Sequence, residues 1–327
     1  MKALIPVAGV GTRLRPLTYT VPKALIGIAG RPILGHIVDQ LVEAGIDEFC
    51  FITSYLGDEI RAWAEQTYDL PMEWVVQKET LGLGHAVLQA EKEIAGSPVF
   101  IVLGDTIFEA DAVSVLEKGG NSLGVMEVEN PSRFGVVVVE GEKVVRLVEK
   151  PEQPVSYLAI AGLYHITQTD LLLECLNRLV AEDIRTRDEY QLTDALSLML
   201  EGEAEFRIFT LEAWYDCGLP ETVLATNRAL LEKVDRGGVR TQGEAVIIPP
   251  VHIGGEVELK GSVVGPYVSV EEGTRITGSV VRNSIIGRNA SVVGALLDGS
   301  LLGDNVVVHG RSVSLNVGDS SEINFEA

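Results

Sequence analysis

The sequence is poor in cysteine, in long apolar runs and in basic side chains, and each shortage excludes a class of protein. Its three cysteines are too few for a disulfide framework, and they form no CxxC pair for a metal or redox site. No run of about 18 uncharged apolar residues occurs, so we expect no membrane-spanning helix. Lys and Arg total 26 against 47 Asp and Glu, and the net charge of −21 would repel nucleic acid and anionic membranes. We expect a cytoplasmic protein that binds neither.

Short apolar segments alternate with helix-like segments over the first two thirds of the chain. This alternation predicts an α/β fold, a Rossmann-like and mostly parallel mixed sheet with helices on both faces. The predicted strands are Ala3–Val7, Phe49–Ser54, Trp74–Gln77 and Val99–Leu103, with a hairpin of Gly135–Val139 and Lys143–Val148. The predicted helices are Leu34–Ala44, Glu59–Gln66, Ala86–Ile94, Leu171–Val180, Leu192–Leu200 and Thr222–Val234.

The pattern changes after about residue 241. Aliphatic pairs recur behind a small residue about every sixteen residues, as in Ser279-Val280-Val281 and Ala295-Leu296-Leu297. Such a period is typical of a β-solenoid, because one coil cannot bury its apolar face without a neighbour. The region resembles the left-handed parallel β-helix built from hexapeptide repeats, and an antiparallel sandwich is the alternative. We therefore expect domains at 1–236 and 241–327, joined at Arg236-Gly237-Gly238.

A glycine-containing loop follows the first predicted strand. Gly9 and Gly11 allow the backbone to approach a ligand and to direct N–H groups at phosphate oxygens. A dinucleotide-binding fingerprint would need a third glycine where Leu14 stands, and a P-loop would need a Gly-Lys dipeptide, which the chain lacks. The cations that follow the loop are Arg13, Arg15 and Lys23. Together they predict a clamp for a polyphosphate.

The string AGVGTRLRPLT…PKALIGI at residues 8–28 resembles the signature GGxGTRLxPLT…PKxLxPI of the sugar-1-phosphate nucleotidylyltransferases, the nucleoside-diphosphate-sugar pyrophosphorylases. Val10 replaces the second glycine of the usual pair, and Ile26-Gly27-Ile28 also departs from the pattern. Neither change removes a charged group. The resemblance continues in the family's order through most of the first 230 residues.

In the nucleotide half, the resemblance assigns binding to Ala8, Gly9, Gly11, Arg13, Gln77 and Gly82. Gln77 and the segment Leu81–Ala86 are similar to the part of the family that contacts the base. A glutamine amide offers a donor and an acceptor, which suits a pyrimidine edge. His85 begins a helix, and we interpret it as a capping or packing residue.

In the other half, the resemblance implies a Mg²⁺ site and a sugar-phosphate site. Asp105 ends an apolar strand, where open α/β sheets bind ligands, and Asp216 lies in the later motif Trp214–Gly218. These two carboxylates are the predicted ligands of Mg²⁺. The predicted sugar-phosphate site consists of Gly135, Glu149, Lys150, Gly162 and Tyr164. Asp188–Ala195 also matches the family, and we expect its role to be mainly structural.

The reaction implied by the resemblance joins a nucleoside triphosphate to a sugar 1-phosphate and releases pyrophosphate. The attacking phosphate oxygen is already ionised, so no side-chain nucleophile or general base is required. Arg13, Lys23, Asp105 and Lys150 are the predicted catalytic residues. The tail and the string Leu315–Asp319 are similar to long-form glucose-1-phosphate thymidylyltransferases, whereas Leu81–Ala86 is similar to UTP–glucose-1-phosphate uridylyltransferases. We therefore expect dTTP or UTP with glucose 1-phosphate.

Two alternatives remain at this point. One is a non-catalytic homologue that binds a nucleotide sugar for regulation, although such proteins usually lose the clamp or metal residues. The other is a bifunctional enzyme with acetyltransferase activity in the tail, for which His252 and His309 are the candidate catalytic residues. We expect the tail instead to support a homo-oligomer or allosteric control.

Overall fold

The computed structural model describes residues 1–235 and 237–310. They form two compact units, the first Met1–Thr226 and the second beginning at Asn227. Arg236 of the expected linker and the string Leu315–Asp319 lie outside the described residues. Among the helices that the structure describes, none combines the length and the apolar character needed to cross a bilayer.

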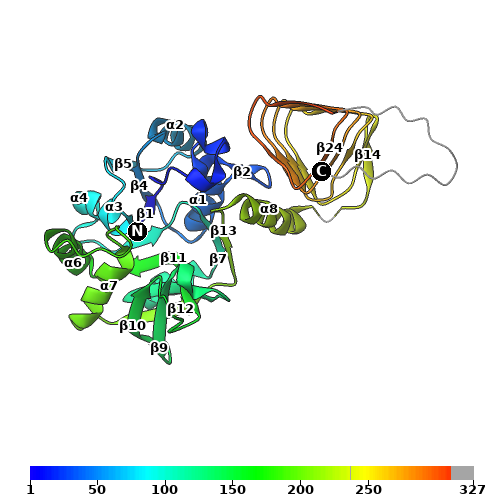
Figure 1. The fold of residues 1–327 in the computed structure, drawn as a ribbon. Helices are drawn as coiled ribbons and strands as arrows, with labels where there is room; N and C mark the ends of the chain where they lie inside the picture. The colour runs from blue at the N-terminus through cyan, green and yellow to red at the C-terminus, as the bar shows by residue number, and fades with distance from the viewer. Residues whose placement is uncertain (236, 311–327) are drawn as a thin grey trace. The chain divides into compact units, whose positions relative to one another are not determined.

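The first unit is built on a nine-stranded mixed sheet with the order β5-β4-β1-β6-β11-β8-β12-β10-β9 (Figure 1). Strands β5, β4, β1 and β6 are parallel to one another, whereas β11 runs antiparallel to β6 and β8. The prediction of a mostly parallel sheet is therefore correct only for the half of the sheet formed by β5, β4, β1 and β6. The strands are β1 Lys2–Pro6, β4 Glu48–Thr53, β5 Met72–Val76, β6 Val99–Val102, β8 Asn121–Glu127, β9 Gly135–Glu140, β10 Lys143–Glu149, β11 Leu158–Ile166 and β12 Phe206–Thr210.

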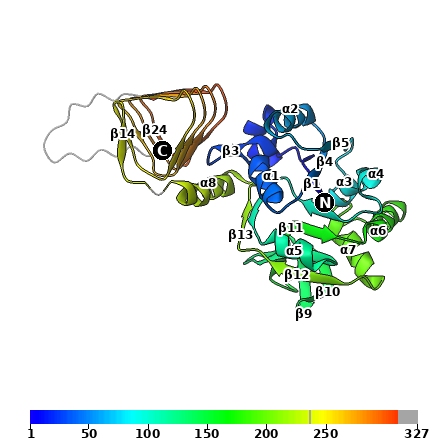
Figure 2. The same ribbon diagram turned by 180° about the vertical axis from the view of Figure 1, so that it is seen from behind.

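Helices cover this sheet. Apolar side chains of α3, α6 and α7 form one core cluster with Leu4 of β1, Ile101 of β6 and Leu123 of β8. Figure 2, seen from behind, brings α1 and α5 in front of the sheet. The predicted helix Ala86–Ile94 is two helices, separated at Ala90. The helices are α1 Ile33–Glu43, α2 Gly57–Thr67, α3 Leu83–Gln89, α4 Glu91–Ile94, α5 Ala112–Lys118, α6 Thr169–Ala181 and α7 Leu192–Glu201.

Two short pairs of strands complete the first unit. β2 (Gly27–Ile28) pairs with β3 (Arg31–Pro32). β7 (Thr106–Glu109) pairs antiparallel with β13 (Ala213–Asp216), so that Asp216 lies opposite Thr106. This second pairing brings the two predicted metal carboxylates to the same part of the fold, because Asp105 directly precedes Thr106.

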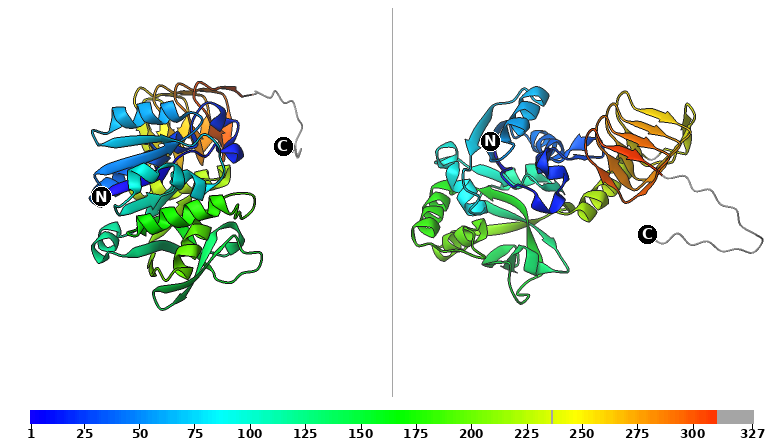
Figure 3. Two further views of the ribbon diagram at one scale, coloured as in Figure 1. Left: turned by 90° about the vertical axis from the view of Figure 1, so that its left-hand side faces the viewer. Right: turned by 45° about the horizontal axis from the view of Figure 1, so that its top comes forward.

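The second unit is a solenoid whose stacked coils are visible in Figure 3. Its three sheets have the orders β14-β15-β18-β21-β24, β16-β19-β22-β25 and β17-β20-β23-β26. All neighbours are parallel except β14 and β15, which excludes the antiparallel sandwich. The strands are β14 Arg240–Gln242, β15 Ala245–Ile247, β16 Val251–Ile253, β17 Glu258–Lys260, β18 Val263–Val264, β19 Val268–Val270, β20 Arg275–Thr277, β21 Val280–Arg282, β22 Ser284–Ile286, β23 Ser291–Val293, β24 Leu296–Asp298, β25 Leu301–Leu302 and β26 Val307–His309.

The small residues of the repeat bind one coil to the next. The Ser262 hydroxyl accepts a hydrogen bond from the Ser279 backbone N–H, 17 residues later. The Ser279 hydroxyl accepts from Ala295 N–H, and the Ser284 hydroxyl from Ser300 N–H, each 16 residues later. These bonds satisfy buried backbone donors, which explains why a small hydroxyl residue precedes the aliphatic pair.

Helix α8 (Pro220–Val234) contains the division between the two units. Its residue Asn227 is buried, and its amide oxygen accepts a hydrogen bond from the Ser269 hydroxyl of β19 at 2.6 Å. The guanidinium of Arg228 donates to the Asn283 side chain at 2.9 Å. The last turns of α8 therefore pack on the solenoid.

Candidate active site

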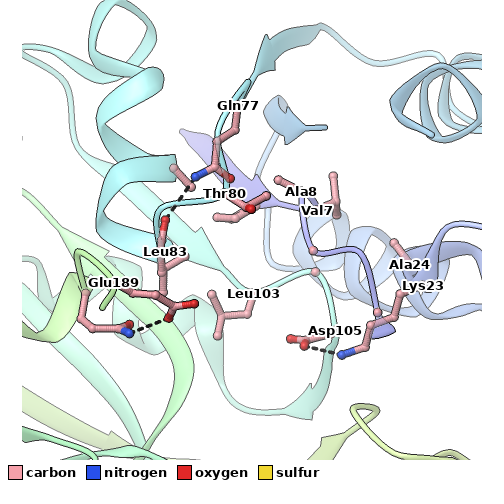
Figure 4. Close-up of a pocket in the computed structure, with 17 residues that line it drawn as sticks. Val7, Ala8, Lys23, Ala24, Gln77, Thr80, Leu83, Leu103, Asp105 and Glu189 are labelled. Carbon is pink, nitrogen blue, oxygen red and sulfur yellow. Dashed lines mark hydrogen bonds and ion pairs between the residues drawn. The ribbon is translucent and has the colours of Figure 1, made fainter. Parts of the chain in front are cut away.

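A cavity of about 410 Å³ lies at the carboxyl ends of β1 and β6 (Figure 4). This is the edge at which open α/β sheets bind ligands. Lys23 and Asp105 line it together with most of the predicted nucleotide-binding residues, namely Ala8, Gly9, Gly11, Gln77 and Gly82. The structure therefore brings the glycine loop and the predicted base-binding segment to one cavity.

A second cavity, of about 390 Å³, adjoins the first. Arg13 and both predicted metal ligands line it, as do all the predicted sugar-phosphate residues, which are Gly135, Glu149, Lys150, Gly162 and Tyr164. The residues that line both cavities are Leu83, Leu103, Asp105 and Gln191. Two ligands bound in these cavities would thus meet beside Asp105.

The glycine loop leaves its backbone accessible to the first cavity. At Gly9, an added Cβ would meet no atom within 4 Å, so this side of the loop faces open space. Gly11 has a φ of +66°, a left-handed conformation that glycine adopts without strain. The Thr18 hydroxyl donates to the Gly11 carbonyl at 2.7 Å and holds the loop in this shape.

Three of the cations that line the two cavities are paired with carboxylates of the same site. The Lys23 ammonium lies 2.5 Å from the Asp105 carboxylate, a contact drawn in Figure 4. The Arg133 guanidinium lies 3.4 Å from Asp216. The Lys150 ammonium lies 3.1 Å from Glu149, whose side chain is only 6% exposed. An entering phosphate can replace the carboxylate in each pair without leaving a cation unpaired.

The carboxylates of this site suit a hard divalent cation. Asp105 and Asp216 line the same cavity, and the Cys217 N–H donates to the Asp105 carbonyl at 3.1 Å. Within residues 1–235 and 237–310, no three or more His, Cys, Asp or Glu side chains form a group that could hold a metal. Mg²⁺ usually binds through one or two carboxylates, substrate phosphates and water, so two carboxylates beside a phosphate site fit this ion.

Neither Cys217 nor Tyr164, the thiol and the phenol that the structure describes at this site, is an activated nucleophile. Burial raises the pKa of the Cys217 thiol to about 12, and the nearby carboxylates of Asp105 and Asp216 act in the same direction. Burial also raises the pKa of the Tyr164 hydroxyl. Both groups are therefore protonated at neutral pH, which agrees with a reaction in which the substrate supplies the attacking oxygen.

Residues 188–195 do more than the structural role that the sequence suggests. Glu189 and Gln191 line the first cavity, and Gln191, Leu192 and Thr193 line the second. The buried Gln191 amide donates to the Glu189 carboxylate at 2.8 Å. The resemblance of this segment to the family was the available signal, but the residue types alone did not indicate that four of them reach the site.

Arg15 is not placed as the polyphosphate clamp requires. It is absent from the described linings of both cavities, and its guanidinium carbon lies 4.9 Å from the centre of the Tyr19 ring. Arg133, for which the sequence suggested no separate role, lines the second cavity and pairs with Asp216. The cations of the site are therefore Arg13, Lys23, Arg133, Lys150 and Arg187.

The chain is similar to several known proteins. A low-salt glycan biosynthesis nucleotidyltransferase from Haloferax volcanii is 32% identical, over 99% of both chains. A glucose-1-phosphate thymidylyltransferase from Streptomyces antibioticus is 30% identical, over 94% of this chain and 93% of its own. The solved structure of UDP-glucose pyrophosphorylase in its apo form matches with a TM-score of 0.64 and 26% identity, over 71% of this chain and 98% of that one.

The family model described as nucleotidyl transferase matches residues 2–233, which span the glycine loop, both cavities and all the predicted site residues. This match covers more than half of the chain. The chain belongs to the nucleotidyl transferase family.

Proposed function

We propose that this protein transfers a nucleotidyl group from dTTP or UTP to a sugar 1-phosphate, glucose 1-phosphate in the first instance, and releases pyrophosphate. One observation carries the proposal: two adjoining cavities meet at Asp105, one lined by the glycine loop and Lys23, the other by Glu149 and Lys150. The first has the residues for a triphosphate and a base. The second has the residues for a phosphorylated sugar.

In this reaction an oxygen of the sugar phosphate forms a bond to the α-phosphorus, and the bond from that phosphorus to pyrophosphate breaks. Bringing two anions to about 4 Å costs on the order of 4 kcal/mol at an effective dielectric of about 20. Lys23 offsets this repulsion on the triphosphate and Lys150 offsets it on the sugar phosphate. Arg13, which lines the second cavity, acts where the two phosphates meet. Catalysis is then alignment and charge neutralisation by groups that are already in place.

Asp105 and Asp216 are the residues that would hold Mg²⁺. When bound, this ion neutralises phosphate charge and polarises the α-phosphoryl group. Gln77 and Gly82 contact the base. Glu149 accepts hydrogen bonds from sugar hydroxyls, and Gly135, Gly162 and Tyr164 form the wall against which the sugar lies.

We extend the proposal to the solenoid and the domain bounds. The solenoid has the left-handed sense, the domains extend over 1–236 and 241–327, and the solenoid supports a homo-oligomer. The parallel coils of 16 to 17 residues support a β-helix, and its left-handed sense follows from the resemblance to hexapeptide repeats.

A panel of triphosphates against sugar 1-phosphates, with pyrophosphate release as the measurement, tests the function. We expect turnover with dTTP or UTP and glucose 1-phosphate in the presence of Mg²⁺. Binding of a nucleotide sugar without pyrophosphate release from any pair would contradict the proposal and favour a regulatory homologue.

Replacing Lys150 with alanine should act mainly on the sugar phosphate. The ammonium contacts Glu149 at the wall of the second cavity, so its loss removes a charge that binds this substrate. We expect the KM for the sugar 1-phosphate to rise about 10- to 100-fold, the worth of a charged hydrogen bond. The KM for the triphosphate should change little. Lys143→Ala, at the start of β10 and paired with Glu205, is the control; an equal effect there would refute the assignment.

A further inference from the structure

We propose that His85 is a positioning residue that fixes the amide of Gln77 so that its carbonyl oxygen faces the base. The consequence is a preference for bases that carry an imide N–H, as uracil and thymine do, over cytosine. The inference rests on the proposed function, since it takes the first cavity as the nucleotide site. It replaces the capping or packing role that the sequence suggested for His85.

The Gln77 side chain is held by its nitrogen. Gln77 is 4% exposed and follows β5 at the wall of the first cavity. Its Nε2 donates to the Gly82 carbonyl at 3.2 Å and lies 3.1 Å from Nδ1 of His85. A carbonyl can only accept, so the nitrogen and not the oxygen must face Gly82. Both N–H bonds of the amide are thereby used.

The hydrogen bond from Gln77 Nε2 to His85 Nδ1 determines which tautomer the His85 ring adopts. Nδ1 must carry a lone pair, and the ring hydrogen is therefore on Nε2. Nε2 lies 3.2 Å from the side-chain nitrogen of Gln89, one turn later on α3. A neutral ring accepts at one nitrogen only, so in this tautomer the Gln89 nitrogen donates to the His85 carbonyl, at 3.5 Å, and not to the ring. The tilted ring of Tyr190, 6.5 Å away between centres, limits how His85 can turn.

Gly82 places its carbonyl where Gln77 can reach it. Gly82 has a φ of +108°, and an added Cβ would lie 2.6 Å from the Tyr190 carbonyl oxygen. The segment is therefore pressed against residues 189–191 and has little freedom to move. His85 and Gly82 form two fixed acceptors for one amide.

The arrangement leaves one group of Gln77 for a ligand. Its Oε1 makes no hydrogen bond to any part of the chain that the structure describes. This oxygen can accept a hydrogen bond from N3–H of uracil or thymine. Cytosine presents a lone pair at N3, which would face the oxygen unfavourably, and turning the amide to suit it would break both existing bonds.

Nucleotide binding measured by calorimetry, separately from turnover, tests the inference with UTP and CTP as probes. The wild-type protein should bind UTP more tightly than CTP. In His85→Leu we expect UTP affinity to fall about tenfold, as for loss of one hydrogen bond, and the preference over CTP to shrink by a similar factor. The kcat with UTP should change less than the KM.

Two further variants separate positioning from folding. His85→Asn keeps an acceptor close to the place of Nδ1, so it should recover most of the UTP preference. Lys92→Ala, on the exposed side of α4, should match the wild type. If His85→Leu weakens UTP and CTP equally, or if His85→Asn behaves like His85→Leu, His85 only packs and the inference is wrong.

The outcomes for the inference and for the proposed function can be told apart. A protein that prefers UTP to CTP through His85 but releases no pyrophosphate would refute the transfer reaction and leave the role of His85 standing. A protein that turns over UTP and CTP alike would support the transfer reaction and overturn the inference.

Discussion

Replacing Lys23 with alanine should lower kcat by about 10³-fold, the range seen when a preorganised charge that stabilises a transition state is removed. The Lys23 side chain is 13% exposed, and its ammonium lies 2.5 Å from Asp105, where the two cavities meet. Charge on the triphosphate grows as pyrophosphate departs, so the loss should appear in kcat more than in KM. Single-turnover kinetics with saturating substrates measure this directly.

Arg15→Ala is the matched control for Lys23→Ala. Both residues are cations from the same region of the chain, but Arg15 lies over the Tyr19 ring and outside the described linings of both cavities. We expect its kcat to stay within a few-fold of the wild type. If both variants lose the same activity, only the overall positive charge of the loop matters, and the role assigned to Lys23 is wrong.

Replacing Asp105 with asparagine should have an effect of similar size, roughly 10³-fold on kcat, because it removes one of two predicted metal carboxylates and the partner of Lys23. The variant should also require a higher Mg²⁺ concentration for half-maximal rate. Chelation of divalent cations should abolish turnover in the wild type. Rates measured over a series of Mg²⁺ concentrations test both statements.

The control for Asp105→Asn is Asp69→Asn, an exposed carboxylate between α2 and β5. It should change neither the rate nor its dependence on Mg²⁺. Full activity of the wild type in excess chelator would refute the metal site. An Asp105→Asn variant with a normal Mg²⁺ dependence would instead remove Asp105 from it.

The sequence predicts well those parts of the fold that short-range patterns determine. The strand at Ala3–Val7 is confirmed as Lys2–Pro6, because a short apolar run between polar residues has few other stable forms. The solenoid period is confirmed because each coil repeats the same local arrangement of hydroxyl and aliphatic residues. The break at Ala90 could not be predicted, since alanine is a strong helix former and gives no stop signal.

The sequence did not predict the features that depend on pairing between distant parts of the chain. β7 and β13 are four residues each, and neither predicts its partner, yet their pairing brings Asp216 beside Asp105. The Lys23–Asp105 and Arg133–Asp216 contacts join residues 82 and 83 positions apart. Motif order predicted residues that line the two cavities, but it could not separate Lys23 from Arg15, because both are cations near the same loop.

The serine bonds between coils constrain how the solenoid can change in length. Each hydroxyl binds a backbone N–H on the adjacent coil, 16 or 17 residues away. Inserting a single residue within a strand would turn the following side chains of that strand to the opposite face and move these hydroxyls out of reach. A one-residue difference at a corner is tolerated, since the corner between β18 and β19 is one residue longer than the corner between β21 and β22. Duplicating or deleting one whole coil would preserve the bonds on either side. Single residues can therefore be gained or lost at the corners, whereas the number of strands in each sheet changes by whole coils.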